Sequence, residues 1–474
     1  MSSKQTGSNE ILKKDHLVDD TLALLIGKGI MSATEKKMGV EIEMPFVKKS
    51  DLKPLQFSGE KSITAIFNAL VKSGFWAPGE IERGKITGLK GESGNVSLEP
   101  GGQIEYAGAP RTSLKQIEAD VNAYYKEIQS IGKKLGVDVV PFGFHPHLSI
   151  EETPFISERS RFAALKPVFE AEKGFAVWGQ SSSVQLTLDG AAMEDPMSAF
   201  KLGLQLQPLA AAIFANSPFE QGHDSGYKSV RREKLLALDS PYYTVPDKLF
   251  EKEFTIQDWA AHVLTVPMSF VVRNNEYIAV APKPFIEMVG KPLPELAHLP
   301  EDQQCLTQKD LLDHITGIKP EMLLKPNLLL EFRAADLGPT PQHWVALAAF
   351  WTGIFYDKDA FKEAQDYVAG WSNEQRISFR KNVAKHGLQT EAGGLTAQQA
   401  ALDLIKISKS GLMKVEPGAV HMLDVLIEQV SKGITSADIA LKEFVENGGD
   451  MVQTLHKNFL LAPKKGKGGP KGGE

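Results

Sequence analysis

The pattern of apolar and polar positions divides the chain into two parts. Up to about residue 335, short runs of alternating apolar and polar residues, typical of half-buried strands, are interleaved with helical patterns. After Thr340 the apolar residues recur mainly at helical spacing. The pattern therefore predicts an α+β protein with a mainly helical C-terminal part.

Two of the predicted helices have clear signals at their ends. Residues 113–136 carry apolar side chains at helical spacing, with Ser113 and Gln116 as a candidate capping box and Gly136 as the stop. Asp195, which precedes a proline, is the expected N-cap of another helix, and this helix must kink or stop near Pro208. We assign no chemistry to these elements, because such helices mostly serve packing.

Two more helices are predicted in the C-terminal part. Thr340 with Pro341 opens one that runs through "HWVALAAFWTGIFYD". Thr396 with Gln399 caps the other, and Gly411 is expected to close it.

The expected domain organisation is simple. We predict an N-terminal segment over residues 1–36 and a single domain over 37–462, in which 340–462 is mainly helical. Residues 463–474 are rich in Gly, Lys and Pro and are predicted to form a disordered tail.

Composition narrows the class of protein. The 474 residues are 42% apolar and 24% charged, as in soluble globular proteins, and the net charge of −6 recruits neither nucleic acid nor an anionic membrane. The single cysteine, Cys305, excludes an internal disulfide and fits a reducing compartment. No segment has the roughly 20 apolar residues of a membrane span. We expect a cytoplasmic protein with neither nucleic acid nor membrane as a partner.

Four strand patterns carry acids or amides on their polar side. In "MGVEIEMPF", Glu41 and Glu43 point away from Val40 and Ile42, because side chains alternate along a strand. The same alternation gives a polar face to "QIEYAG" with Glu105, to "SVQLTLDG" with Gln185, and to "LLLEFRAAD" with Glu331 and Arg333; Glu99 stands before the Pro-Gly-Gly turn of "SLEPGGQIEYAG". Each strand alone is explained by a solvated sheet face.

Together, however, these residues indicate a metal–phosphate site. Mg²⁺ prefers oxygen ligands shared between a few carboxylates and substrate phosphates, and its charge would relieve repulsion among the glutamates. Arg333 is permanently charged and suits a phosphate oxygen. We therefore predict a metal–nucleotide site on an open antiparallel sheet, on the assumption that the four strands belong to one sheet.

At these residues the chain resembles the glutamate–cysteine ligases of the plant and proteobacterial type. The most specific stretches are "LEPGGQIEYAGAP" (98–110) and "EFRAAD" (331–336). The likeness spans roughly residues 38 to 450 and also includes "GVEIE" (39–43) and "SVQLTLD" (183–189).

The resemblance implies a fold and a reaction. The fold is a large antiparallel sheet, curved around the active site and backed by helices, as in glutamine synthetase. ATP, the co-substrate, phosphorylates the γ-carboxylate of glutamate, and the amine of cysteine attacks the γ-glutamyl phosphate, in the first step of glutathione synthesis. Mg²⁺ is the implied cofactor, and the implied assembly is a monomer or homodimer.

The resemblance also implies roles for individual residues. The metal-binding positions of the family fall on Glu41, Glu43, Glu99, Glu105, Gln185 and Glu331. Arg333 falls beside the transferring phosphate, where it and Glu331 are the catalytic candidates. Arg231 is the candidate for the α-carboxylate of glutamate, with Arg161 as a further substrate-binding candidate.

Two alternatives stay open. After Arg231 the chain reads "RREKLLALDSPYY", which departs from the family pattern in a region that shapes the substrate pocket, so another amine is an alternative acceptor. A non-catalytic regulator that binds glutamate or a nucleotide is the rival from another class, and the intact acid set argues against it. Outside this set, His145 and His147 in "FGFHPHL" have the spacing of a metal-binding pair, but a polar strand end explains them better.

Overall fold

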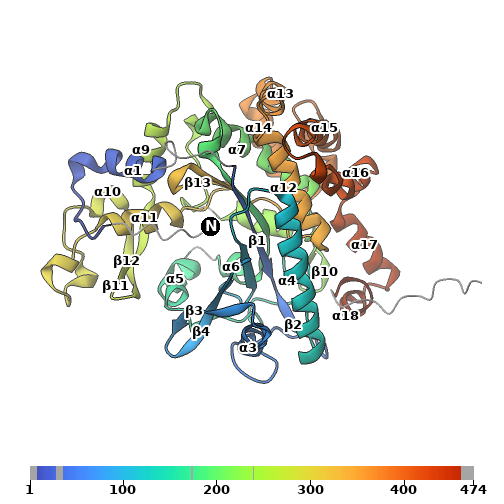
Figure 1. Cartoon of the computed structure of the whole chain (residues 1–474), viewed down its shortest axis with the longest axis horizontal. Coiled ribbons are helices and arrows are strands. Elements are labelled where there is room, and N and C mark those ends of the chain that lie inside the picture. The colour runs from blue at the N-terminus through green and yellow to red at the C-terminus, as the bar shows by residue number, and fades with distance from the viewer. Residues whose placement is uncertain (1–7, 28–35, 172–173, 239, 461–474) are drawn as a thin grey trace, which may run out of the picture.

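The structure, a computed structural model, describes residues 8–27, 36–171, 174–238 and 240–460. Its centre is an eight-stranded sheet in which neighbouring strands are antiparallel, with helices packed around it (Figure 1). The predicted α+β class with a large antiparallel sheet is thereby confirmed, while the predicted tail over 463–474 lies outside the described residues. In sheet order the strands are β13 (Met322–Lys325), β14 (Leu329–Phe332), β8 (Val184–Asp189), β1 (Met38–Met44), β6 (Ile104–Gly108), β5 (Gly94–Leu98), β4 (Lys85–Gly91) and β3 (Trp76–Glu82).

The register of the sheet brings the predicted polar side chains together. Glu41 on β1 lies opposite Gln185 on β8, and Glu43 lies opposite Glu105 on β6. Glu331 on β14 lies opposite Thr187 on β8. The assumption that the four patterned strands form one sheet is therefore correct.

Two long helices cover the opposite, apolar face of the sheet. They are α4 (Leu114–Leu135) and α12 (Pro341–Phe355). Tyr124 of α4 stacks on Tyr106 of β6 with ring centroids 4.5 Å apart, and Trp351 of α12 stacks on Phe332 of β14 at 4.4 Å. All four rings are buried, so the main hydrophobic core lies between the sheet and these helices.

The helix starts agree with the sequence, but one capping detail differs. Ser113 caps α4 by accepting a hydrogen bond from the backbone N–H of Lys115. The predicted partner Gln116 is replaced by Glu416, whose carboxylate accepts the hydroxyl proton of Ser113 and the backbone N–H of Leu114. Gly136 ends the helix in the left-handed conformation, as predicted.

One predicted helix end is wrong, and another helix runs through its proline. The helix that begins after Asp195, α7 (Pro196–Ile213), continues past Pro208 without stopping there, and most of its side chains are buried. The predicted end of α15 (Ala397–Val415) at Gly411 is wrong, because this helix continues past it. Gly411 serves packing instead, because a β-carbon there would lie 1.9 Å from the carbonyl oxygen of Gly353 on α12.

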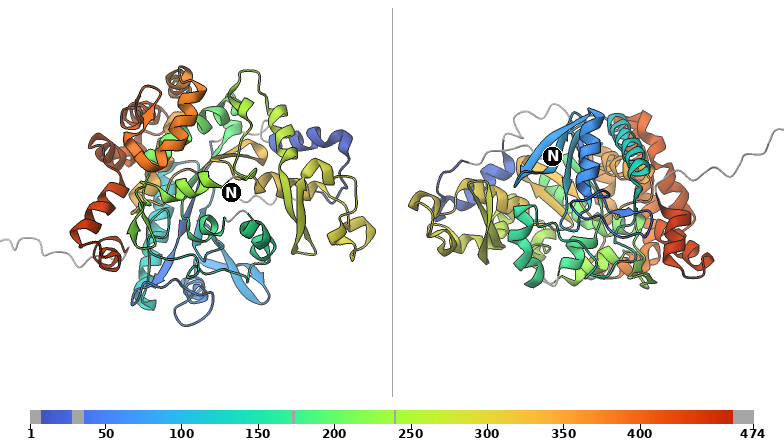
Figure 2. Two further views of the ribbon diagram at one scale, coloured as in Figure 1. Left: turned by 180° about the vertical axis from the view of Figure 1, so that it is seen from behind. Right: turned by 90° about the horizontal axis from the view of Figure 1, so that it is seen from below.

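A smaller lobe stands beside the sheet, at the end of the molecule away from the C-terminal helices (Figures 1 and 2). The N-terminal segment joins this lobe, since the backbone N–H of Leu12 donates to the carbonyl of Leu306 at 3.0 Å. The division of the chain at residue 36 stays a prediction. The elements of the lobe are α1 (Leu17–Ile26), α9 (Ile256–Thr265), β11 (Pro267–Arg273), β12 (Glu276–Pro284), α10 (Phe285–Met288) and α11 (Gln308–Gly317).

The remaining helices and strands lie mostly in the C-terminal part and around the sheet. Beyond α12 the chain is mainly helical, as predicted. No helix in the described part of the chain is long and apolar enough to span a membrane. The C-terminal elements are α13 (Lys358–Ala369), α14 (Asn373–His386), β15 (Glu391–Ala392), β16 (Leu395–Thr396), α16 (Asp424–Ser431), α17 (Ser436–Glu446) and α18 (Met451–Thr454). The others are β2 (Phe46–Lys48), α3 (Ile63–Ser73), β7 (Val137–Val139), α5 (Ser160–Ala171), α6 (Phe175–Gln180), β9 (Phe219–Glu220), β10 (His223–Asp224) and α8 (Val230–Ala237).

Candidate active site

A large cleft, with a volume of about 1580 Å³, lies over the polar face of the sheet. The sheet forms one wall, and residues of α5, α8 and β11 contribute to the others. The structure brings together in this cleft Glu41, Glu43, Glu99, Glu105, Gln185, Arg161, Arg231 and Arg333. Glu331 does not line it, because its side chain is completely buried behind its neighbours.

The Pro-Gly-Gly turn holds Glu99 next to Glu105. The backbone N–H of Gly102 donates to the carbonyl of Glu99 at 2.9 Å, and Gly102 has a φ of +86°. Gly101 packs directly on α6, where a β-carbon would lie 1.9 Å from the carbonyl oxygen of Gly179. The glycines thus allow a tight hairpin between β5 and β6 to seat against a helix and aim its two glutamates into the cleft.

A hydrogen-bonded chain links Glu43 to Arg333. The Glu43 carboxylate accepts from the backbone N–H of Ser183 at 2.7 Å and from the side-chain amide of Gln185 at 2.8 Å. The amide oxygen of Gln185 in turn accepts from the guanidinium of Arg333 at 2.6 Å. Gln185 therefore connects an acid and a cation on the polar face of the sheet.

The acids Glu41 and Glu331 on the polar face are balanced by cations. Glu331 forms ion pairs with both Arg333 and Lys325. The ammonium of Lys325 also lies 3.8 Å from the Glu41 carboxylate. Strand β13, which was not among the four predicted strands, thus adds a lysine to this face.

The pKa values separate Glu41, which has a cation beside it, from Glu43 and Glu105. Burial raises the pKa of Glu43 to about 7, followed by the negative charge of Glu99. Burial, together with the charges of Glu41 and Glu99, raises the pKa of Glu105 well above its ordinary value. For Glu41, burial is outweighed by positive charges, chiefly Lys325, which hold its pKa well below the usual range. Surplus negative charge is therefore concentrated around Glu43, Glu99 and Glu105.

This surplus suits a shared cation rather than a closed protein cage. Among the described residues, no three acidic, histidine or cysteine side chains form a group that could hold a metal ion. Glu105 lies opposite Glu43 in the sheet and is hydrogen-bonded with Glu99. Mg²⁺ is commonly held by one or two carboxylates together with substrate phosphates. The donor set fits a magnesium ion that enters with a phosphate-bearing substrate.

Arg231 is fixed at the other side of the cleft with one donor to spare. Its guanidinium donates to the backbone carbonyls of Arg333, at 2.9 Å, and Ala334, at 3.3 Å. Its Nε is buried and has no hydrogen-bond partner among the described residues. Burial lowers the pKa of Arg231, with the charges of Asp336 and Glu43 opposing. Arg231 lines the cleft, and a ligand oxygen there would give this unpartnered donor an acceptor.

Sequence reasoning missed several residues of this site. Ser183 holds Glu43, and Lys319 and Lys325 line the cleft. Asp336, which anchors the loop around Arg231, closes the motif "EFRAAD" and could have been found there. Lys325 carried no clear signal, because it precedes a proline at the end of a four-residue strand.

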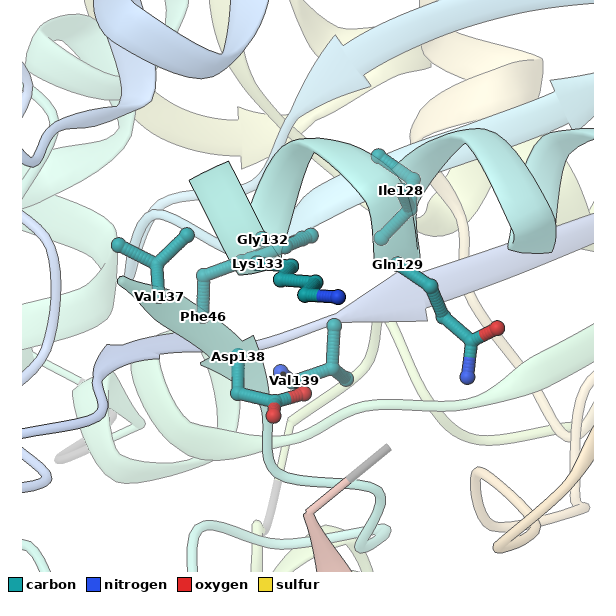
Figure 3. Close-up of a pocket in the computed structure, with 8 residues that line it drawn as sticks. All are labelled: Phe46, Ile128, Gln129, Gly132, Lys133, Val137, Asp138 and Val139. Atoms are coloured by element: carbon teal, nitrogen blue, oxygen red, sulfur yellow. Dashed lines mark hydrogen bonds between the residues drawn. The ribbon is translucent and has the colours of Figure 1, made fainter. Parts of the chain in front are cut away.

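The other candidates lie outside the cleft or serve the sheet. His145 and His147 are neighbours with ring centroids 5.0 Å apart, but no third metal ligand joins them among the described residues. A further hollow between α4 and β7, with Gln129 and Asp138 on its walls (Figure 3), has a volume of about 10 Å³, which is barely room for one water molecule.

Comparison with known proteins first defines the class of this chain as a ligase. The model of the family "Glutamate-cysteine ligase family 2 (GCS2)" matches residues 37–458. The chain belongs to this family, as its sequence resemblance predicted.

The relatives and a solved structure agree with this assignment. Glutamate–cysteine ligase B, chloroplastic, of Oryza sativa subsp. japonica is 31% identical over 446 residues, which are 93% of this chain and 87% of the relative. The chloroplastic glutamate–cysteine ligase of Arabidopsis thaliana is 29% identical over 453 residues, covering 95% and 84%. The fold is similar to glutamate–cysteine ligase from Francisella tularensis in complex with AMP, with a TM-score of 0.50, 9% identity and coverage of 90% and 89%.

The relatives contradict the predicted cytoplasmic location. Those named above from rice and Arabidopsis, and another from Brassica juncea, are named as chloroplastic enzymes, which contradicts the prediction. The prediction rested on composition and on the single cysteine. These exclude an internal disulfide but do not distinguish one reducing compartment from another.

Proposed function

We propose that the chain is an ATP-dependent ligase that joins the γ-carboxylate of glutamate to the amine of cysteine through a γ-glutamyl phosphate, the first step of glutathione synthesis. The family and the names of the relatives support the substrates. The observation that carries the chemistry is the convergence of Glu43, Glu99 and Glu105 with Arg333 and Arg231 in one cleft. Phosphoryl transfer needs little covalent help from the protein and much neutralisation of charge, which this set provides.

The glutamates would bind the metal ion, and Arg333 would bind the phosphate of ATP. Mg²⁺, when bound, would neutralise phosphate charge and the repulsion among the glutamates. One or two of Glu43, Glu99 and Glu105 would hold it together with the phosphates. Glu41, Gln185 and Glu331 remain proposed ligands that would first have to leave their present partners. Arg333 contacts both Gln185 and Glu331. It would bind the γ-phosphoryl group as negative charge develops on that group.

The substrate glutamate would be oriented by arginine. The spare Nε of Arg231 would donate to its α-carboxylate, and Arg161 on α5 would add a second positive charge from across the cleft. Held in this way, the γ-carboxylate would face Arg333. Fixing both reactants replaces a bimolecular encounter by reaction within one complex, which is a large share of catalysis in such reactions.

A second acceptor amine is supported by one observation. Tyr242 and Tyr243, from the segment that departs from the family pattern, line the cleft beside Trp178 and Leu235 of a small apolar cluster. An amine with a larger apolar side chain would bury more surface there than cysteine does. We propose cysteine as the acceptor, because the relatives are named for it. We also propose that residues 37–462 form a single catalytic domain.

Product analysis tests this function. The chain is incubated with Mg²⁺, ATP and glutamate, with cysteine or a panel of other amines, and ADP release and the peptide product are measured. We expect ADP release that depends on glutamate and is stimulated by cysteine. With hydroxylamine in place of an amine substrate, trapped glutamyl hydroxamate should report the acyl phosphate. Stimulation by another amine only would overturn the cysteine assignment, and no turnover with any amine would favour a regulator.

A further inference from the structure

Lys325 occupies the border between the buried acids and the cleft. It ends β13, and its ammonium pairs with Glu331 and lies 3.8 Å from Glu41. Its side chain is 15% exposed and lines the cleft, whereas Glu331 is 1% exposed and does not. The ammonium can therefore be reached from the cleft, but its acidic partner Glu331 cannot.

A tight turn fixes the backbone next to Lys325. Asn327 and Leu328, which follow Pro326, have φ values of 62° and 58° in the left-handed region, which is rare for a leucine. The core holds the side chain of Leu328, which is only 2% exposed. Gly27 closes against the same turn, because a β-carbon there would lie 2.1 Å from Oδ1 of Asn327. Such strain persists where surrounding packing enforces it, and it is often found at functional sites.

Further cationic side chains line the same cleft as Lys325. Burial, followed by the charges of Arg333 and Lys325, lowers the pKa of Lys319 well below its ordinary value. Arg161 faces the charge of Asp313, another residue that lines the cleft. Glu41 and Glu331 are already neutralised by Lys325 and Arg333. An anionic ligand such as a polyphosphate would complete this side of the cleft.

We propose that Lys325 is a phosphate-binding residue of the nucleotide site, and that it neutralises Glu41 and Glu331 only until a metal-bound nucleotide enters. This role rests on the nucleotide site proposed above. Glu41 and Glu331 would then hold a divalent cation in place of the ammonium. The flexible four-carbon stem of lysine then lets the ammonium move to a phosphate oxygen, which the planar and more rigid fork of arginine does less readily.

The proposal predicts opposite changes in two affinities of Lys325→Met. Titration calorimetry measures Mn²⁺ alone, ATP with Mn²⁺, and AMP. Mn²⁺ alone should bind more tightly, because its competitor for the glutamates is gone. ATP with Mn²⁺ should bind about 10–100-fold more weakly, since a charge-assisted contact is lost, and AMP should bind as before. Lys325→Arg, which keeps the charge, should retain more of the ATP affinity than Lys325→Met.

A matched control and the wild-type chain separate the outcomes. Lys90→Met removes another lysine that lines the cleft, from β4, and should leave all three affinities unchanged. Unchanged ATP binding by Lys325→Met would overturn the role of Lys325. Equal losses of Mn²⁺ and ATP binding would also overturn it, because that is the result expected if the ion pairs of Lys325 only support the fold. Failure of the wild-type chain to bind ATP would instead overturn the nucleotide site itself.

Discussion

The guanidinium of Arg231 lies 3.6 Å from the carboxylate of Asp336, and both side chains are buried. The same carboxylate accepts hydrogen bonds from the backbone N–H of Asn216 at 2.9 Å, from Ser217 at 2.7 Å and from Ser229 at 3.1 Å. Ser229 is also the N-cap of α8, the helix that carries Arg231. Asp336 thus fixes both the charge and the position of the proposed glutamate-binding arginine.

Asp336→Asn is expected to weaken glutamate binding more than it slows turnover. The variant keeps the shape of the side chain but removes the charge that faces Arg231, so the KM for glutamate should rise about tenfold, roughly 1.4 kcal/mol, with a smaller fall in kcat. Steady-state kinetics with glutamate varied measures this split. Asp224→Asn, at an exposed turn, is the control. Equal loss for all substrates would show that Asp336 supports only the fold.

Arg333→Lys is expected to lower kcat by about 100-fold or more. Nη1 of the guanidinium now contacts both Gln185 and Glu331. A planar guanidinium can also offer a phosphate two parallel N–H donors, which the point charge of a lysine ammonium does not reproduce. Arg376→Lys, outside the cleft, should leave kcat unchanged. A kcat within a factor of about two of the wild type would remove Arg333 from the phosphoryl-transfer step.

Gly101→Ala is expected to destabilise the hairpin that carries Glu99 and Glu105. The new β-carbon would lie 1.9 Å from the carbonyl oxygen of Gly179, so backbone must move, at a cost of about 1–3 kcal/mol. Denaturant unfolding measures the loss. Gly418→Ala is the control, because its β-carbon would meet no atom within 4 Å. The activity should fall with the stability, since the turn positions two proposed metal ligands.

The free energy of unfolding is expected to fall in mild acid because of His343. Burial, opposed by a hydrogen bond from Gln429, lowers the pKa of this histidine to about 4, from an ordinary value of 6.5. The unfolded chain therefore binds the proton first, and the stability present above pH 6.5 is lost as the pH falls towards 4, by up to about 3 kcal/mol. His343→Gln should show a shallower loss than the wild type in urea titrations between pH 7 and 4. Equal slopes would contradict this role.

The alternation of side chains along strands was enough to predict the acid face. Glu41, Glu43, Glu105 and Gln185 share a face because the period of a strand is two, and the sheet register then places them opposite one another. The order of the strands did not follow from periodicity. Lys325 escaped prediction, because the direction of its side chain depends on the pairing of β13 with β14.

Helix ends show the same limit. Gly136 and Gly411 give the same local signal, yet only Gly136 ends a helix in the left-handed conformation. At Gly411 the close packing of α15 on α12 decides the outcome, since Gly353 leaves no room for a side chain there. Local signals predict a helix stop only where tertiary packing does not use the glycine for another purpose.

A crystal soaked with Mn²⁺ and a non-hydrolysable ATP analogue tests the central claim most directly. We expect an anomalous peak for Mn²⁺ between the phosphates and the carboxylates of Glu43, Glu99 and Glu105, with Arg333 in contact with the γ-phosphate. A nucleotide bound outside this cleft, or a metal peak remote from all three glutamates, would contradict the account.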